Sequence, residues 1–212
     1  MHILIITDKE PVSSLWGKPF PLEGCVVLYS IEPTKTNIEA CDVLIDLTFE
    51  EYINRIELYK TSGKIVFIAS VTDTLSSLGA ASAFIARFNN WPSFQERSKA
   101  EFAINKEYLQ KLDALLKGWN IEYEVSVDTP GLISARIVAM IINEAFLAIE
   151  ESVANETDID TAMKLGTNYP KGPFEWCNEI GAKKIVTLLE QLAVINSSYT
   201  PATLLKQKAH EQ

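Results

Sequence analysis

The chain contains only two histidines, His2 and His210, and both lie near its ends. A catalytic or metal site built on an internal histidine is therefore excluded. The three cysteines, Cys25, Cys41 and Cys177, do not have the spacing of metal ligands, and so few thiols are typical of a reducing cytoplasm. We therefore expect a cytoplasmic protein that binds no metal.

The sequence also lacks long hydrophobic runs and clusters of basic residues. No stretch of about 18 apolar residues exists, so we expect no membrane span. The apolar start of the chain turns acidic after six residues, which is too short for a signal peptide. The net charge of −9 argues against a nucleic-acid partner, because phosphate binding needs clustered Lys and Arg. The length of 212 residues suits one large domain or two small ones.

Apolar runs rich in β-branched residues predict buried strands in the first 128 residues. The predicted strands cover residues 2–7, 25–31, 42–48, 64–70 and 120–127. Helical spacing of apolar residues predicts a helix within 50–63 and a longer one over 98–119. A strand, a helix and a strand in this order form a βαβ unit, which implies a parallel sheet. We therefore predict an α/β domain over residues 1–128.

From residue 129 to 212, helical signals follow one another without a strand-like run. The predicted helices are 132–154, a segment capped by Thr157 or Asp158 that stops at Gly166, a segment begun by Pro173 that stops at Gly181, AKKIVTLLEQLAVI, and a last helix after Pro201. The first of these is apolar almost all round, which indicates burial on several sides. An all-helical domain over residues 129–212 is therefore predicted.

The turn after the first predicted strand has no glycine. In a dinucleotide-binding fold, glycines here let the backbone approach the pyrophosphate, which sits on a helix N-terminus. Thr7–Val12 instead offers the carboxylates Asp8 and Glu10, so we interpret it as a surface turn rather than an unorthodox phosphate loop. The position expected to hold the ribose is Ser30, with Glu32 close by. We therefore expect no bound NAD.

Polar residues follow the fourth predicted strand, at the edge where parallel sheets bind ligands. Ser70, Thr72 and Asp73 are there, and they are candidate substrate-binding residues. An equally weighted alternative is structural, since Asp73 or Thr74 would supply the N-cap of a following helix.

Two further polar positions are candidates on weaker grounds. Glu101, on the predicted helix 98–119, is a candidate catalytic residue, although a lone glutamate is more often a solvated surface charge. Asn89 lies with Arg87 in a predicted loop and is a candidate for substrate binding, although polar loops usually have no catalytic role.

A stretch of about 50 residues, DTPGLISARIVAMIINEAFLAIEESVANETDIDTAMKLGTNYPKGPFEW, resembles the C-terminal domain of the 3-hydroxyacyl-CoA dehydrogenases. The variant with Tyr169 and Trp176 looks most like the second, degenerate repeat of some bacterial members, including those of phenylacetate breakdown. The resemblance implies a shortened Rossmann-like parallel sheet followed by an all-helical dimerisation domain.

The N-terminal half is similar to the same family, with parts missing. ACDVLIDLTFEE, KIVFIASVTDTLSSL and FIARFNNWPSF resemble its successive strand motifs. The resemblance aligns the catalytic histidine of the family with Phe88 or Arg87, the glutamate that orients it with Glu101, its serine with Asp73, and its asparagine with Ala135. The helical arm that helps to hold CoA would have only residues 33–39. NAD is therefore implied by the resemblance alone, and the residues that would bind it are missing.

These observations lead to one expectation and two alternatives. We expect a family protein of fatty-acid and acyl-CoA metabolism without ordinary catalytic activity, acting as a binding or partner subunit for an acyl-CoA-type ligand and forming a homodimer through its helical domain. One alternative is an active NAD-dependent 3-hydroxyacyl-CoA or 3-hydroxybutyryl-CoA dehydrogenase with Glu101 or Asp73 as its base. The other is a structural subunit that pairs with a full-length dehydrogenase.

Overall fold

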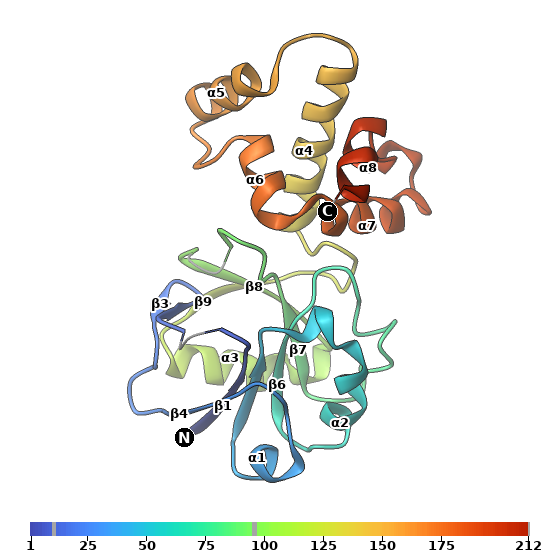
Figure 1. The fold of residues 1–212 in the computed structure, drawn as a ribbon. Helices are drawn as coiled ribbons and strands as arrows, with labels where there is room; N and C mark the ends of the chain where they lie inside the picture. Colours follow the sequence, from blue (N-terminus) through green and yellow to red (C-terminus); the bar gives the residue numbers. More distant parts are fainter. Residues whose placement is uncertain (10–11, 95–96, 212) are drawn as a thin grey trace. The chain divides into compact units, whose positions relative to one another are not determined.

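The computed structural model of the chain describes residues 1–9, 12–94 and 97–211. The chain consists of two compact units, Met1–Leu132 and Ile133–Gln212 (Figure 1). The predicted domain boundary lies between residues 128 and 129. Within the described ranges, no helix is long and apolar enough to cross a membrane.

The first unit is built on a seven-stranded sheet in the order β4-β1-β5-β6-β7-β8-β9. The strands are β1 (His2–Ile6), β4 (Val26–Ser30), β5 (Val43–Asp46), β6 (Ile65–Ala69), β7 (Ile85–Phe88), β8 (Lys99–Ile104) and β9 (Glu122–Val125). Neighbouring strands are parallel except β7 and β8, which are antiparallel. The five predicted strands are all present, and the predicted α/β fold with a mostly parallel, Rossmann-like sheet is confirmed.

The prediction of one helix over 98–119 is wrong in its first part. The segment consists of β8, the 3₁₀ turn η3 (Lys106–Tyr108) and helix α3 (Leu109–Gly118). In β8, the alternate residues Ala100, Phe102 and Ile104 are buried in one core, which is the two-residue period of a strand. An apolar segment this short fits the spacing of a helix as well as that of a strand. It forms a strand here because it pairs with β7 and β9.

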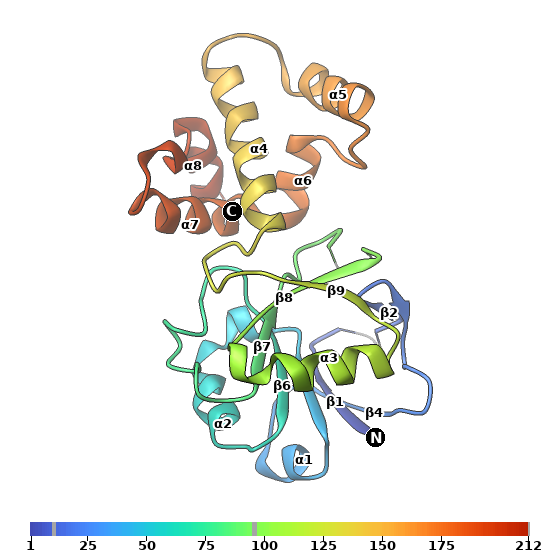
Figure 2. The same ribbon diagram turned by 180° about the vertical axis from the view of Figure 1, so that it is seen from behind.

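A hydrophobic core lies on each face of the sheet, and helix α3 covers one of these faces (Figure 2). The helical elements are α1 (Lys35–Glu39), the 3₁₀ turns η1 (Phe49–Glu51) and η2 (Ile53–Arg55), α2 (Ile56–Lys60) and α3. On one face, Leu116 of α3 and its C-cap residue Trp119 pack into the core. On the other face, Ile38 of α1 and Tyr59 of α2 pack against the strands. The helix predicted within 50–63 is therefore α-helical only in its second half.

The second unit is all-helical, as predicted. It contains α4 (Ser134–Glu150), α5 (Glu156–Thr167), α6 (Pro173–Ile180), α7 (Ala182–Ala193), the 3₁₀ turn η4 (Ser197–Tyr199) and α8 (Thr203–His210). Helix α4 packs against α6, α7 and α8 (Figure 1). Its buried Asn143 donates to the carbonyl of Thr200 at 3.0 Å and accepts from the N–H of Ala202 at 2.8 Å. This amide therefore fixes the start of α8 against α4.

The ends of α5 differ from the prediction, whereas α6 matches it. Asn155, not Thr157 or Asp158, caps α5, because its Oδ1 accepts the N–H of Asp158 at 3.0 Å. Helix α5 passes Gly166 and ends at Thr167, and its C-cap Asn168 has a φ of 57° in the left-handed region. Helix α6 starts at Pro173 and stops before Gly181, as predicted.

Candidate functional site

The carboxyl ends of β6 and β7 meet around one buried arginine, Arg87. This residue lies in β7 and its side chain is fully buried, so its expected position in a loop is wrong. Its Nε donates to Oδ1 of Asp128 at 2.6 Å, and its Nη1 donates to the carbonyls of Ser70 and Val71 at 3.2 and 3.3 Å. Its Nη2 donates to the carbonyl of Thr129. The guanidinium thus ties β6 and β7 to the end of the first unit.

Three carboxylates balance the charge of Arg87. Burial lowers the pKa of Arg87, and the hydrogen bond and charge of Asp128, followed by the charges of Glu101 and Asp73, oppose that shift. Glu101 lies in β8, not on a helix as predicted, and it is half-buried. The register of β7 and β8 pairs Phe88 with Phe102, so the next pair outward along the two strands is Asn89 and Glu101. Two of the predicted site residues are therefore neighbours at this edge.

The predicted substrate-binding residues Ser70, Thr72 and Asp73 form one polar turn after β6. The Ser70 hydroxyl is buried and donates to the carbonyl of Asp73 at 2.8 Å, and the Thr72 hydroxyl donates to the Asp73 carboxylate at 3.4 Å. The N–H of Val71 donates to the carboxylate of Glu50 at 2.6 Å. The polar groups of this turn therefore bond mainly to one another and to Glu50.

The alternative that Asp73 or Thr74 caps a helix does not describe this turn. Thr74 and Ser77 exchange hydrogen bonds of 3.0 Å between hydroxyl and backbone N–H, but residues 75–79 form turns rather than a helix. The carboxylate of Asp128 accepts the N–H groups of Leu75 and Ser76, both at 3.1 Å. Asp128 therefore holds this turn and Arg87 at the same time.

Asn89 is also occupied locally. Its side chain is 6% exposed, and its Oδ1 accepts the N–H of Trp91 at 2.9 Å. The adjacent Asn90 donates its amide to the carbonyl of Leu47, which follows β5. Asn89 thus shapes the turn that leaves β7, and Asn90 ties this turn to the chain after β5, two strands away in the sheet.

Sequence reasoning missed a buried carboxylate at the end of β5. Asp46 is fully buried, and its two oxygens accept from Thr48, from Arg55 at 3.2 Å and from the hydroxyl of Tyr59 at 2.6 Å. Burial raises the pKa of Tyr59 above its ordinary value, and the charge of Asp46 adds to that shift. The signal in the sequence was an aspartate that ends a buried apolar strand, with an arginine nine residues later.

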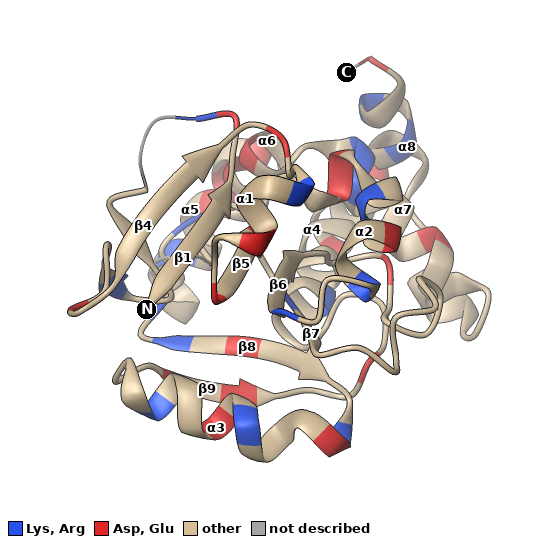
Figure 3. Cartoon of the chain, turned by 90° about the horizontal axis from the view of Figure 1, so that it is seen from below, with Lys and Arg blue, Asp and Glu red and all other residues tan. Residues whose placement is uncertain are grey.

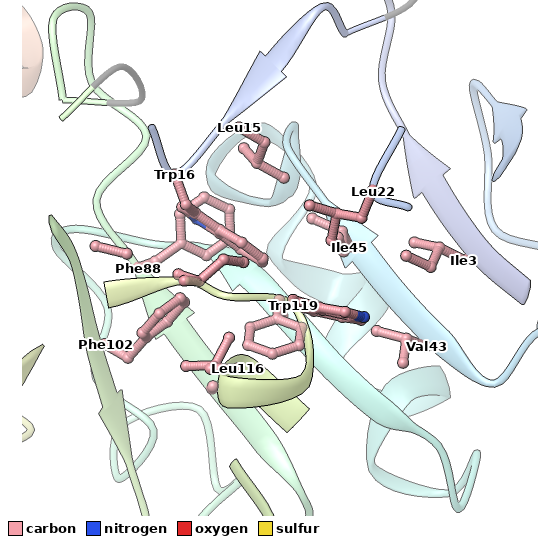
Figure 4. Packing of buried hydrophobic residues seen from close by; sticks show 14 of the residues in the cluster. Ile3, Leu15, Trp16, Leu22, Val43, Ile45, Phe88, Phe102, Leu116 and Trp119 are labelled. Atoms are coloured by element: carbon pink, nitrogen blue, oxygen red, sulfur yellow. The ribbon is translucent and has the colours of Figure 1, made fainter. Parts of the chain in front are cut away.

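Glu10 and Pro11 of the predicted turn after β1 lie outside the described residues, and the chain beyond them forms a short ribbon. Residues 14–19 contain the short strands β2 (Ser14–Leu15) and β3 (Lys18–Pro19), joined by Trp16 and Gly17, both with positive φ. Trp16 is 3% exposed, and its ring packs edge-on against Phe88 and Phe102 at 5.3 and 5.1 Å (Figure 4). A Cβ on Gly17 would lie 2.4 Å from a backbone oxygen, so only glycine fits there.

NAD, which the family resemblance implies, does not fit this arrangement. A pyrophosphate requires glycines that open the backbone and a helix N-terminus that points at it. In the described residues between β1 and β4, no helix follows the strand, and the chain is turned inward by Trp16. Among the residues that the structure describes, no three His, Cys, Asp or Glu side chains gather as metal ligands.

Comparison with known proteins identifies relatives of the helical unit. Residues 131–212 match the family described as 3-hydroxyacyl-CoA dehydrogenase, C-terminal domain. The 3-hydroxyadipyl-CoA dehydrogenase of Escherichia coli (strain K12) is 50% identical over 84 residues, which are 39% of this chain and 18% of that protein. A probable 3-hydroxybutyryl-CoA dehydrogenase of Bacillus subtilis (strain 168) is 28% identical over 201 residues, covering 84% of this chain and 67% of that protein. The chain thus spans between about a fifth and two thirds of these two relatives.

Solved structures show the same fold. The (S)-3-hydroxybutyryl-CoA dehydrogenase of Ralstonia eutropha matches with a TM-score of 0.73 at 22% identity, over 87% of this chain and 70% of that one. The 3-hydroxybutyryl-CoA dehydrogenase of Escherichia coli K12 matches with a TM-score of 0.57 at 32% identity, over 68% of this chain and 31% of that one. Residues 131–212 therefore form a C-terminal domain of the 3-hydroxyacyl-CoA dehydrogenase type, and the chain as a whole is similar to dehydrogenases that carry this domain.

Proposed function

We propose that this chain is a binding or partner subunit of the 3-hydroxyacyl-CoA dehydrogenase family, in acyl-CoA and fatty-acid metabolism, that does not itself oxidise a substrate with NAD. The observation that carries the proposal is the segment between β1 and β4, where the described residues form no helix and Trp16 is buried in the core. The indole packs against four aromatic neighbours and fixes this segment to the core, in place of the helix N-terminus that would bind a pyrophosphate.

The chemistry of the site supports the same proposal. Oxidation of a hydroxyl needs a base within hydrogen-bond reach of it. The two positions aligned with the family histidine hold Phe88, which is buried in the core, and Arg87, whose guanidinium remains protonated and already donates to four oxygens of this chain. Neither side chain can accept a proton from a substrate.

The ligand that we propose is an acyl-CoA-type thioester bound without turnover. The relatives are named for CoA thioesters. In this chain, the polar turn of Ser70, Thr72 and Asp73, with Asn89 and Glu101 beside it, lies at the carboxyl edge of the sheet, where parallel sheets bind ligands.

The helical unit supports a role in assembly, as a homodimer or with a full-length dehydrogenase. None of the twelve residues of α5 is buried, although the helix carries Ile159, Met163 and Leu165, the last of them 84% exposed. Val153, just before α5, is 69% exposed. A helix without buried side chains gains little from its own chain, and packing against a second chain would remove this apolar surface from water.

A thermal-shift screen with NAD, NADH and a series of acyl-CoAs tests the proposal. A ligand that binds only the folded state stabilises it by about 2.7 kcal/mol at a hundred times its dissociation constant. We expect a shift with an acyl-CoA, no shift with NAD or NADH, and no change in absorbance at 340 nm when 3-hydroxybutyryl-CoA and NAD are added. Turnover or a shift with NAD would favour the active-dehydrogenase alternative and overturn the proposal.

A further inference from the structure

Strand β4 forms one edge of the sheet, and its five residues include neither a charge nor a proline. Its neighbour in the sheet is β1 alone. Natural edge strands are normally blunted by charges, proline or a covering segment. From Cys25 to Ile31 the chain has no charged residue, whereas the opposite edge strand, β9, carries Glu122 and Glu124 (Figure 3).

The side chains of this edge are apolar and exposed. The exposed fractions are 54% for Val26, 38% for Leu28, 40% for Tyr29 and 70% for Ile31. Because successive side chains of a strand point to opposite faces, the exposed apolar surface lies on both sides of β4. Such a strand is a template for pairing with another strand.

The backbone of β4 shows which groups are available. The N–H of Val26 donates to the carbonyl of Met1 at 2.9 Å, and the carbonyl of Ser30 accepts from Thr7 at 3.0 Å, so the even-numbered residues face β1. The N–H and C=O groups of Val27 and Tyr29 therefore point outward, and no described residue forms a hydrogen bond with them.

The flanking residues are partly engaged. Cys25 also faces outward, and its N–H donates to the carbonyl of Leu22 at 3.1 Å. The carbonyl of Ile31 accepts from Nη2 of Arg55 at 3.3 Å. The outward groups that remain are the carbonyl of Cys25, both groups of Val27 and Tyr29, and the N–H of Ile31.

We propose that the β4 edges of two copies of this chain pair antiparallel about a two-fold axis through Leu28. In this register, Val27 faces Tyr29 of the second copy, and each pair exchanges two hydrogen bonds. Cys25 faces Ile31 of the second copy, so the carbonyl of Cys25 accepts the N–H of Ile31. The N–H of Cys25 and the carbonyl of Ile31, which already have partners within the chain, lie opposite each other. With the axis at Val27, the N–H of Cys25, which already bonds to Leu22, would face the carbonyl of Tyr29 and leave it without a donor. With the axis at Tyr29, the N–H of Val27 would face the carbonyl of Ile31, which already bonds to Arg55.

The side chains and charges fit the same register. Leu28 meets its own copy in a non-hydrogen-bonded pair, in which side chains are closest. Val27 beside Tyr29 is a β-branched and aromatic cross-strand pair, a combination that stabilises sheets. The nearest charges, Glu23 and Glu32, fall opposite Pro33 and Gly24, so no like charges face each other. This pairing goes beyond the proposed function, because it does not involve the helical unit.

Cysteine cross-linking tests the register directly. In a Cys25→Ser background, Leu28→Cys places two thiols on residues about 4.5 Å apart between Cα atoms, within the range of a disulfide. Val26→Cys, on the same face of the same strand, separates the two thiols by roughly 13 Å. We expect mild oxidation to give a species of twice the 23.7 kDa chain mass at least tenfold faster with Leu28→Cys.

The control is stringent, because Val26 is the more exposed of the two residues and random collisions would favour it. Equal rates for the two variants, or faster cross-linking of Val26→Cys, would overturn the proposal. So would the absence of any cross-link with Leu28→Cys.

Proline variants test the backbone bonds without a new thiol. Val27→Pro removes an N–H that points away from β1, which an edge strand tolerates. We expect it to abolish the Leu28→Cys cross-link, while Val125→Pro on the opposite edge leaves it unchanged. Because α5 is untouched, assembly through the helical unit persists in Val27→Pro, so a failure here is distinguishable from a failure of the proposed function.

Discussion

Nε of Arg87 lies 2.6 Å from Oδ1 of Asp128, although the two residues are 41 positions apart and belong to the core of β7 and to the last turn of the first unit. Arg87 is fully buried and Asp128 is 25% exposed at its side chain. The guanidinium also holds three backbone carbonyls. One ion pair therefore joins the middle of the sheet to the segment that leads out of it.

Removal of the Asp128 carboxylate should be costly, because it leaves Arg87 buried without its counter-charge. Breaking a buried pair costs about 3–5 kcal/mol, and partial exposure of Asp128 reduces this, so we expect Asp128→Ala to lower the free energy of unfolding by about 2–3 kcal/mol. Urea denaturation measures the loss. Glu57→Ala, which breaks an exposed pair with Lys60, is the control and should change little. Equal losses of unfolding free energy in the two variants would show that the burial of Arg87 does not make its ion pair more important for stability.

Truncation of Trp16 should destabilise the first unit strongly. Its ring contacts Phe67, Phe88, Phe102 and Trp119, so Trp16→Ala opens a cavity and should cost about 3–5 kcal/mol. Trp16→Phe keeps part of the packing and should cost less. Guanidinium denaturation followed by far-UV circular dichroism compares the two. A Trp16→Ala variant as stable as the wild type would mean that the indole is not part of the core.

The hydroxyl of Tyr59 should matter for stability and for its dependence on alkaline pH. Tyr59→Phe removes a donor from the buried carboxylate of Asp46 and should cost about 1–3 kcal/mol. Tyr123→Phe, whose hydroxyl donates to the surface residue Asp113 at 2.7 Å, is the matched control with a smaller expected loss.

The pKa of Tyr59 is raised by burial and by Asp46 above the ordinary value of 10.0. The unfolded chain releases this proton near pH 10 and the folded chain does not, so the stabilisation is complete below pH 10 and is lost as the pH rises. The free energy of unfolding, measured from pH 9 to 11, should therefore fall more steeply in the wild type than in Tyr59→Phe. Identical slopes would contradict the raised pKa.

Acid should weaken the helical unit through Glu175. Its carboxylate bonds to Lys164 and to the N–H of Gly172, and these two contacts lower its pKa from the ordinary value of 4.5. The stabilisation is therefore present above pH 4.5 and is lost as the pH falls. Between pH 5 and about 3, the melting temperature of Glu175→Gln should fall less than that of the wild type, whereas the exposed variant Glu190→Gln should behave as the wild type does.

One thiol should react well before the other two. Cys41 and Cys177 are buried, and burial raises the pKa of both, that of Cys177 to about 11. Because the thiolate is the reactive form, reagents at pH 8 should label the half-buried Cys25 first. A colorimetric thiol assay should detect a fast phase that Cys25→Ser removes. A fast phase that survives in Cys25→Ser would contradict this order.

Local patterns in the sequence were sufficient for the buried parallel strands and the helical unit, because each is set by short-range apolar spacing. They were insufficient for β8, where KAEFAI fits either period and only pairing with β7 selects the strand. The pattern around Arg87 predicts a loop because a charge in a buried strand is rare, and the residue that neutralises this charge, Asp128, lies far along the chain. The cluster around Asp46 was missed for the same reason.

The neighbours of Trp16 also set the order in which the first unit can be completed during synthesis. Trp119, stacked on Trp16 at 6.4 Å, is made roughly 100 residues later, and a ribosome adding about 5–20 residues per second needs on the order of 5–20 s to reach it. Until then the core around Trp16 is incomplete, and the indole stays exposed to solvent. A chaperone that recognises exposed aromatic segments would therefore meet residues 12–22 first.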